Sequence, residues 1–73
     1  MAELRIKADI AGVVSKVLVQ AGADLAEDEP LMLMESMKME IPVQAPRAGR
    51  VLQVCASEGE QVAEGDLLAV MQV

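Results

Sequence analysis

The sequence predicts an all-β fold, a small sandwich or barrel of about seven short strands. Three observations indicate this class: apolar and charged residues alternate near the N-terminus, the other apolar runs are rich in β-branched residues, and glycines separate these runs at regular intervals. The chain of 73 residues allows a single domain, residues 1–73. Because 53% of the residues are apolar and none is aromatic, the core is expected to be entirely aliphatic.

The first half of the chain is predicted to begin with two strands and an acidic loop. Over Ala2–Ala8, apolar residues alternate with charged ones, which is the period of a half-buried strand. The run Val13–Val19 is rich in β-branched residues, and Gly12 and Gly22 at its borders are expected to form turns. The acidic segment Ala23–Glu29 is expected to form a short helical turn at most, because it is too brief for a core helix.

The second half predicts further strands of the same kind. Gly49 and Gly59 bound one of these runs, as Gly12 and Gly22 bound the run before it. Leu31–Met34 closes the first half as Leu67–Val73 closes the second, and the other apolar runs are Met39–Gln44 and Val51–Ala56.

The chain contains an internal repeat. A shift of 37 positions superimposes residues 10–35 on residues 47–72 without a gap, and nine of the 26 pairs are identical. Chance matching would give roughly two or three identical pairs, so the two halves are expected to share one structure about a pseudo-twofold axis. The identical pairs are Ala11/Ala48, Gly12/Gly49, Val14/Val51, Val17/Val54, Gly22/Gly59, Ala26/Ala63, Glu27/Glu64, Leu31/Leu68 and Met34/Met71.

The repeat also predicts where the two ends of the chain lie. Met39 is the equivalent of Ala2, and Ser36 is the equivalent of Val73. If Ser36 and Met39 pair across a hairpin, the two chain ends should lie side by side in the same way. The central hairpin and the termini would then occupy opposite ends of the molecule.

The centre of the chain predicts that hairpin. Residues 31–43 are nearly palindromic about Met37-Lys38, so a two-residue turn would pair Ser36 with Met39 and Glu35 with Glu40. Since side chains alternate along a strand, the apolar residues of the hairpin are expected to face the core. These residues are Met32, Met34, Ile41 and Val43.

Two features of this hairpin indicate more than a neutral loop. Glu35 and Glu40 would stand directly opposite each other, which destabilises the strand pair. The tip lacks the Asn-Gly or Asp-Gly of tight turns and instead presents Lys38 between Met37 and Met39. Methionine adapts to varied partners because it is unbranched and polarizable, so this tip resembles a docking surface.

Other polar and reactive residues have simpler interpretations. An exposed lysine is most often a solubilising charge, and Lys7 and Lys16 fit that interpretation because each lies in a predicted strand. Cys55 is the equivalent of Leu18 in the repeat and is expected to be a small core residue. The acidic run 27–29 is expected to be a solvated loop.

The composition excludes several classes of function. The chain has no histidine and one cysteine, so a histidine-based triad, an internal disulfide and a cysteine-based zinc site are excluded, and we expect neither catalytic residues nor a metal. A net charge of −6 argues against nucleic acid and anionic membranes as partners. The sequence shows neither a membrane span nor a signal peptide, so a cytoplasmic location is expected.

The stretch Glu35–Val43, followed by Ala45–Val51, resembles the attachment motif of biotinyl domains, the biotin carboxyl carrier proteins of biotin-dependent carboxylases. The resemblance covers essentially the whole chain. It implies a flattened barrel-sandwich of two four-stranded antiparallel sheets with a pseudo-twofold axis and the target lysine on a tight turn. The Met-Lys-Met core is specific, since related lipoyl domains usually carry an acidic residue before the lysine and alanine after it.

The resemblance also implies roles for individual residues. Lys38 would carry covalently bound biotin, and Met37 and Met39 would be its flanking residues. Glu35 would match the acidic residue of the family motif. The destabilising pairing of Glu35 with Glu40 is a separate ground, and from it we expect both residues to take part in recognition by the ligase and by partner enzymes.

The chain departs from the family pattern in two places. Ser36 stands where many members have alanine, and it is placed with the recognition residues. Asp28 stands where the second half has Gly65, and aspartate tolerates the left-handed backbone better than most residues.

The implied partners are a biotin protein ligase, a biotin carboxylase and a carboxyltransferase of the acyl-CoA or pyruvate type, with the isolated domain expected to be monomeric. The domain itself would be a non-catalytic carrier of the carboxyl group. Two alternatives stay open at this point: a lipoyl carrier or a domain modified by both cofactors, and an unmodified barrel that acts as an adaptor.

Overall fold

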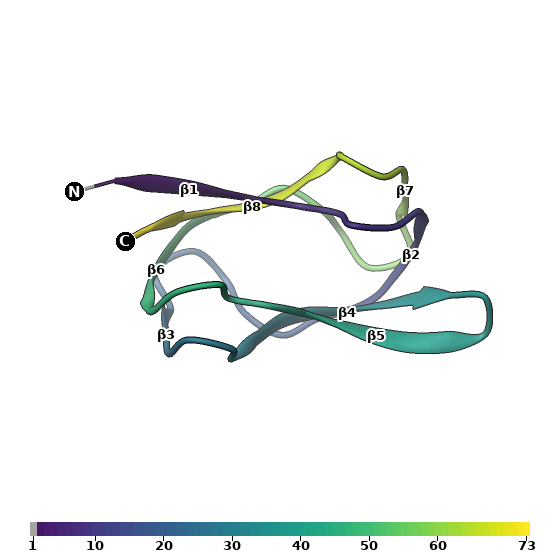
Figure 1. Cartoon of the computed structure of the whole chain (residues 1–73), viewed down its shortest axis with the longest axis horizontal. Coiled ribbons are helices and arrows are strands. Elements are labelled where there is room, and N and C mark those ends of the chain that lie inside the picture. Colours follow the sequence, from purple (N-terminus) through teal and green to yellow (C-terminus); the bar gives the residue numbers. More distant parts are fainter. Residues whose placement is uncertain (1) are drawn as a thin grey trace.

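Two four-stranded antiparallel sheets make up the structure, a computed structural model that describes residues 2–73 (Figure 1). The strand order is β1-β8-β6-β3 in one sheet and β5-β4-β2-β7 in the other. This architecture confirms the predicted all-β class and its two four-stranded sheets. The strands are β1 (Glu3–Lys7), β2 (Gly12–Val17), β3 (Asp24–Leu25), β4 (Pro30–Ser36), β5 (Met39–Gln44), β6 (Gly49–Val54), β7 (Gln61–Val62) and β8 (Leu67–Gln72).

The pseudo-twofold repeat is present in the structure as well as in the sequence. The shift of 37 residues carries β1 to β5, β2 to β6, β3 to β7 and β4 to β8. Backbone hydrogen bonds recur in the same way: Ala8 N donates to Asp66 O at 2.9 Å, and the equivalent Ala45 N donates to Glu29 O at 2.9 Å. The two halves therefore exchange equivalent contacts across the molecule.

The core between the sheets is aliphatic, as predicted. Several of the identical pairs of the repeat lie in this core. Two buried clusters fill the interior, and partly buried Val43 and Val54 pack against both. Three of the identical pairs supply most of the largest buried side chains, so the repeat is retained where side chains must interlock. The largest fully buried side chains are Leu31, Met32, Met34, Leu68, Met71, Val14 and Val51.

The two chain ends lie side by side, as the repeat predicts. Ala2 N donates to Val73 O at 3.1 Å, and Val73 N donates to Ala2 O at 2.9 Å. Figure 1 shows both ends at one extremity of the molecule and the turn between β4 and β5 at the other. The long axis measures 36 Å against 18 and 17 Å for the others, so the turn and the termini are far apart.

The segment Ala23–Glu29 does not form the expected helical turn. Asp24–Leu25 is the two-residue strand β3, which pairs with β6. A tight turn then follows, because Glu29 Oε1 accepts a hydrogen bond from Ala26 N at 2.9 Å and Glu29 N donates to Ala26 O at 3.2 Å. Asp28 has a φ of 69° in this turn, so it adopts the left-handed backbone that the sequence anticipates.

Two further expectations were wrong. Gly12 and Gly49 do not form turns but begin β2 and β6, where each lies tightly against the backbone of the neighbouring strand. Cys55 is only half-buried and belongs to neither core cluster; it follows the last residue of β6, and its equivalent Leu18 is exposed. Gly22 and Gly59 do lie in turns, with φ values of 96° and 87°.

Candidate functional site

Residues 35–40, here called the lysine hairpin, form the turn between β4 and β5 with the predicted register. Ser36 pairs with Met39, and Glu35 pairs with Glu40. The central residues Met37 and Lys38 have φ values of 53° and 65°. Positive φ at both positions is the requirement of a type I′ turn, which matches the twist of the flanking strands.

The turn is held in an unfavourable backbone conformation. A residue with a side chain loses about 1 kcal/mol or more in the left-handed region, and Met37 and Lys38 both occupy it without glycine or asparagine. Such strain persists only when the surrounding structure fixes it, and it concentrates at functional sites. The strain therefore points to a role for this tip.

The loop between β1 and β2 supports the base of the lysine hairpin. Ser36 Oγ donates a hydrogen bond to Ala11 O at 2.9 Å. A Cβ on Gly12 would lie 2.6 Å from Glu35 O, so only glycine lets β2 approach β4 this closely. Ser36, expected to be a recognition residue, is thus also a positioning residue. The sequence analysis did not identify Ala11 and Gly12 as residues that support the lysine hairpin.

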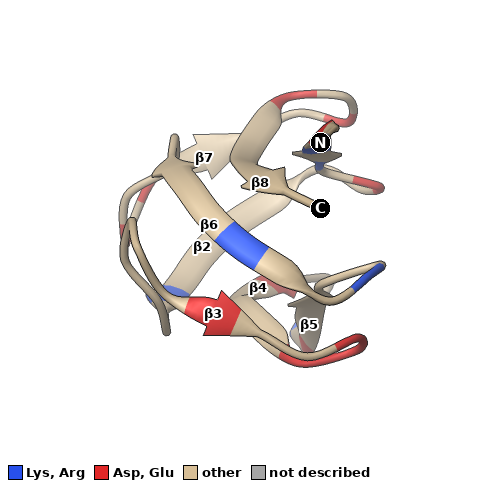
Figure 2. Ribbon diagram, turned by 90° about the vertical axis from the view of Figure 1, so that its left-hand side faces the viewer, with Lys and Arg blue, Asp and Glu red and all other residues tan. Residues whose placement is uncertain are grey.

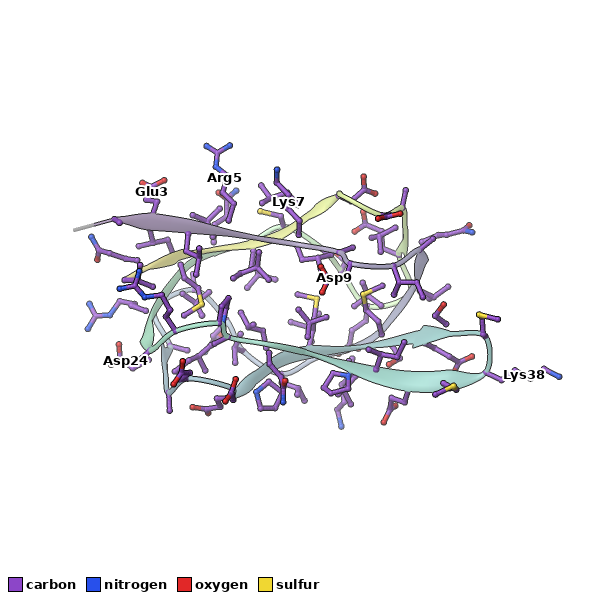
Figure 3. The ribbon with its side chains drawn as sticks, in the orientation of Figure 1. Glu3, Arg5, Lys7, Asp9, Asp24 and Lys38 are labelled. Carbon is purple, nitrogen blue, oxygen red and sulfur yellow. The ribbon has the colours of Figure 1, made fainter. Side chains whose placement is uncertain are left out.

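Lys38 extends away from the body of the molecule into solvent (Figure 3). Its neighbours Met37 and Met39 are 88% and 64% exposed, whereas no other large apolar residue among residues 2–73 exceeds the 43% of Leu18. Within the same residues, no hydrogen bond or ion pair involves the Lys38 amine. The exposed amine is therefore accessible to a reagent or to an enzyme.

Two carboxylates lie together on the outer face beside the tip. Gln61, Val13, Glu35 and Glu40 pair in one row across β7, β2, β4 and β5, and all four are exposed. Directly paired residues on antiparallel strands point to the same side, so the two carboxylates face solvent as neighbours. No basic side chain belongs to this row.

The pseudo-twofold axis supplies an internal comparison for that row. The equivalent row at the other end consists of Asp24, Arg50, Gln72 and Glu3. There, Arg50 Nε donates to Asp24 Oδ1 at 3.0 Å. Figure 2 shows an acidic segment (red) on β3 next to a basic segment (blue) on β6. Val13 takes the place of Arg50 beside the lysine hairpin, so the carboxylate pair lacks the compensating cation. The alignment of the two halves of the repeat already pairs Val13 with Arg50, so the sequence contained the signal for this missing cation.

The rest of the described structure offers little competing chemistry. Among residues 2–73, no group of three or more histidine, cysteine, aspartate or glutamate side chains is arranged to hold a metal ion. No helix of this part of the chain is long and apolar enough to cross a membrane.

Comparison with known proteins agrees with the geometry. The Biotin_lipoyl family model, described as "Biotin-requiring enzyme", matches residues 5–71. A biotinylated protein TB7.3 homolog of Mycobacterium leprae is 44% identical over 66 residues, which cover 90% of this chain and 93% of that protein. Pyruvate carboxylase of Bacillus subtilis is 46% identical over 63 residues, which cover 86% of this chain and only 6% of the enzyme.

The solved structures agree as well. Part of a single-chain, multi-domain long-chain acyl-CoA carboxylase superimposes with a TM-score of 0.88 at 36% identity, covering 94% of this chain and 7% of that one. The chain is thus similar to a small fraction of the large carboxylases and to nearly the whole of a small biotinylated protein. The chain belongs to the Biotin_lipoyl family.

Proposed function

We propose that this chain is a biotin carboxyl carrier domain of a biotin-dependent carboxylase and that Lys38 is the residue that carries biotin. The observation that carries the proposal is the position of this lysine. Its amine stands at the tip of a strained two-residue turn, between two exposed methionines, at the end of the molecule opposite the termini. Similar proteins named as biotinylated or as carboxylases support it.

The lysine hairpin fits a covalently attached carboxylic acid. Biotin is joined to lysine as an amide, which requires a primary amine that a ligase can surround. Lys38 meets this requirement on a projecting tip, whereas Lys7 and Lys16 lie within the strands β1 and β2. A ligase could therefore enclose Lys38 without displacing a strand.

The attachment reaction requires a neutral amine. The ligase must therefore help to remove the ammonium proton before Nζ attacks the activated carboxyl group. Forming the amide removes the positive charge of Lys38, which takes the formal net charge from −6 to −7 (−6 − 1). Bound biotin supplies a ureido ring that accepts and donates a carboxyl group.

The chain itself contributes a rigid, elongated support for this arm. The two sheets fix the tip at one end of the 36 Å axis, and the termini leave from the other end. A tethered group visits successive active sites at a high effective concentration, which raises the rate of transfer without new contacts. The partners would be a biotin carboxylase and a carboxyltransferase, and these would supply the acids, bases and metal ions.

We assign a recognition role to Glu35 and Glu40. Their repulsion costs the hairpin a few tenths of a kcal/mol to about 1 kcal/mol, and nothing in their row offsets it. A basic side chain of the ligase or of a carboxylase subunit would relieve this repulsion on docking.

Glu40→Gln should therefore slow biotinylation, and the effect should shrink at high salt. Glu3→Gln, the equivalent position at the far end, is the matched control and should leave the rate unchanged. If Glu40→Gln matched the parent protein both in the rate of biotinylation and in the rate of carboxylation of the attached biotin, this role would be removed.

The proposed function is tested by expressing the chain with an active biotin ligase and measuring its intact mass. The expected result is one biotin per chain, which Lys38→Arg abolishes and Lys16→Arg does not. A lipoyl adduct would have a different mass and would establish the alternative carrier. An unmodified chain under biotin-replete conditions would favour the adaptor. The cytoplasmic location, the monomeric state and the single domain over residues 1–73 stay predictions.

A further inference from the structure

The described methionines fall into two sharply different groups. Met37 and Met39, on either side of Lys38, are 88% and 64% exposed. The other three, Met32, Met34 and Met71, are at most 1% exposed and belong to the two core clusters. A reagent in solution can therefore reach the sulfur atoms beside the lysine without opening the fold.

Exposed thioethers react with peroxides. In this reaction the sulfur takes one oxygen atom from hydrogen peroxide: an S–O bond forms, the O–O bond breaks, the sulfur loses two electrons, and the peroxide leaves as water. The product is a polar sulfoxide in place of an apolar thioether, and methionine sulfoxide reductases reverse it. The reaction does not change the Lys38 amine or the net charge.

We propose that Met37 and Met39 form a peroxide-sensitive modification site whose oxidation reversibly blocks biotinylation of Lys38. The consequence for biotinylation rests on the proposed function of this lysine, because a ligase that encloses Lys38 must also cover its two neighbours. Burying a polar sulfoxide where a thioether packs is unfavourable, and we expect about a tenfold lower rate. The fold stays intact, because neither sulfur contributes to the core.

Cys55 is the competing target, since it is a half-buried thiol. It lies where the chain leaves β6, and its backbone N donates to Leu68 O of β8 at 2.8 Å, so it is bonded to the sheet that does not contain the lysine hairpin. The experiment therefore uses the unbiotinylated chain with Cys55→Ser in every variant, so that a loss of rate cannot come from the thiol.

The experiment treats this protein with hydrogen peroxide, locates the added oxygen by peptide mass spectrometry, and measures the initial rate of biotinylation by a biotin ligase. We expect oxygen on Met37 and Met39 before Met32, Met34 or Met71, a rate about tenfold lower, and recovery after treatment with methionine sulfoxide reductases A and B. The double variant Met37→Leu/Met39→Leu is the matched variant. Its initial rate of biotinylation should be the same before and after peroxide treatment, even if that rate differs from the parent's. Met34→Leu should stay as sensitive as the parent.

Three results would overturn the inference: oxidation of the buried methionines at the same speed, full oxidation of Met37 and Met39 without a change in rate, or a loss of rate that the double variant shares. The proposed function fails in a different way, since the untreated protein would then accept no biotin at all.

Discussion

Replacing Gly12 with alanine should distort the base of the lysine hairpin. A Cβ at this position would lie 2.6 Å from Glu35 O and 3.3 Å from Ser36 Cβ, whereas ordinary van der Waals contacts begin at 3.4 Å. The overlap of 0.8 Å (3.4 − 2.6) with Glu35 involves backbone, which cannot rotate away as a flexible side chain can. Gly12→Ala should therefore push β4 from β2 just before the turn.

The expected cost follows from two opposing effects. Overpacking of this kind costs about 1–3 kcal/mol, and replacing glycine in a strand regains about 0.5–1 kcal/mol of backbone entropy. The two effects combine to a net loss of about 0–2.5 kcal/mol. We expect a loss in the upper part of this range, about 1–2 kcal/mol, because the contact at 2.6 Å is with backbone. A chain of this length has roughly 4–11 kcal/mol of stability, so the variant should still fold.

Gly49→Ala is the matched control, because the repeat places Gly49 against Gln72 O at the far end of the molecule. Both variants should lose stability in urea denaturation, but only Gly12→Ala should also slow biotinylation by the ligase. If Gly12→Ala kept the parent's stability, the contact would be less tight than the structure shows. If both variants slowed the ligase equally, the effect would be global and the support of the lysine hairpin by β2 would be refuted.

Three further predictions concern stability and are checked by urea denaturation. Ser36→Ala removes the hydrogen bond to Ala11 O and should cost about 0.5–1.5 kcal/mol while biotinylation persists; an unchanged midpoint would show that the bond is not needed. Met71→Ala opens a cavity in the core and should cost about 2–5 kcal/mol, and a loss below 1 kcal/mol would contradict the packing described. Gly65→Ala, at a φ of 89° with open space around its Cβ, should cost about 1 kcal/mol from backbone strain alone, so a stabilised variant would refute that reasoning.

The fold could be predicted from the sequence wherever two parts of the chain can be compared with each other. The near-palindrome about Met37-Lys38 gives the register of β4 and β5, and the shift of 37 residues places Ala2 beside Val73. Both inferences rest on relations between distant residues, so they do not depend on weak local propensities. The same reasoning extends to the position of Lys38 at the end opposite the termini.

The short elements could not be predicted in the same way. The strand Asp24–Leu25 has only two residues and exists because the backbone of β6 lies beside it, so no periodicity marks it. Gly12 looks like a turn residue from its neighbours, and only the approach of β4 shows that it is needed inside a sheet. The exposure of Cys55 likewise depends on where β6 ends.

The residues of the site could be predicted from the sequence, but the residues that surround and support them could not. Lys38 and its flanking methionines follow from the motif, whereas the support from Ala11 depends on a loop folding back across 25 positions of sequence. The aligned halves of the repeat show that Val13 stands where the second half has Arg50, but only the strand register shows that Val13 lies beside Glu35 and Arg50 beside Asp24.

The most direct measurement is peptide mapping by mass spectrometry of the chain after reaction with biotin ligase, ATP and biotin. We expect biotin on the Nζ atom of Lys38 and none on Lys7 or Lys16. Biotin on either strand lysine, or continued labelling of Lys38→Arg, would contradict the claim that the fold presents one amine for modification at the tip of this turn.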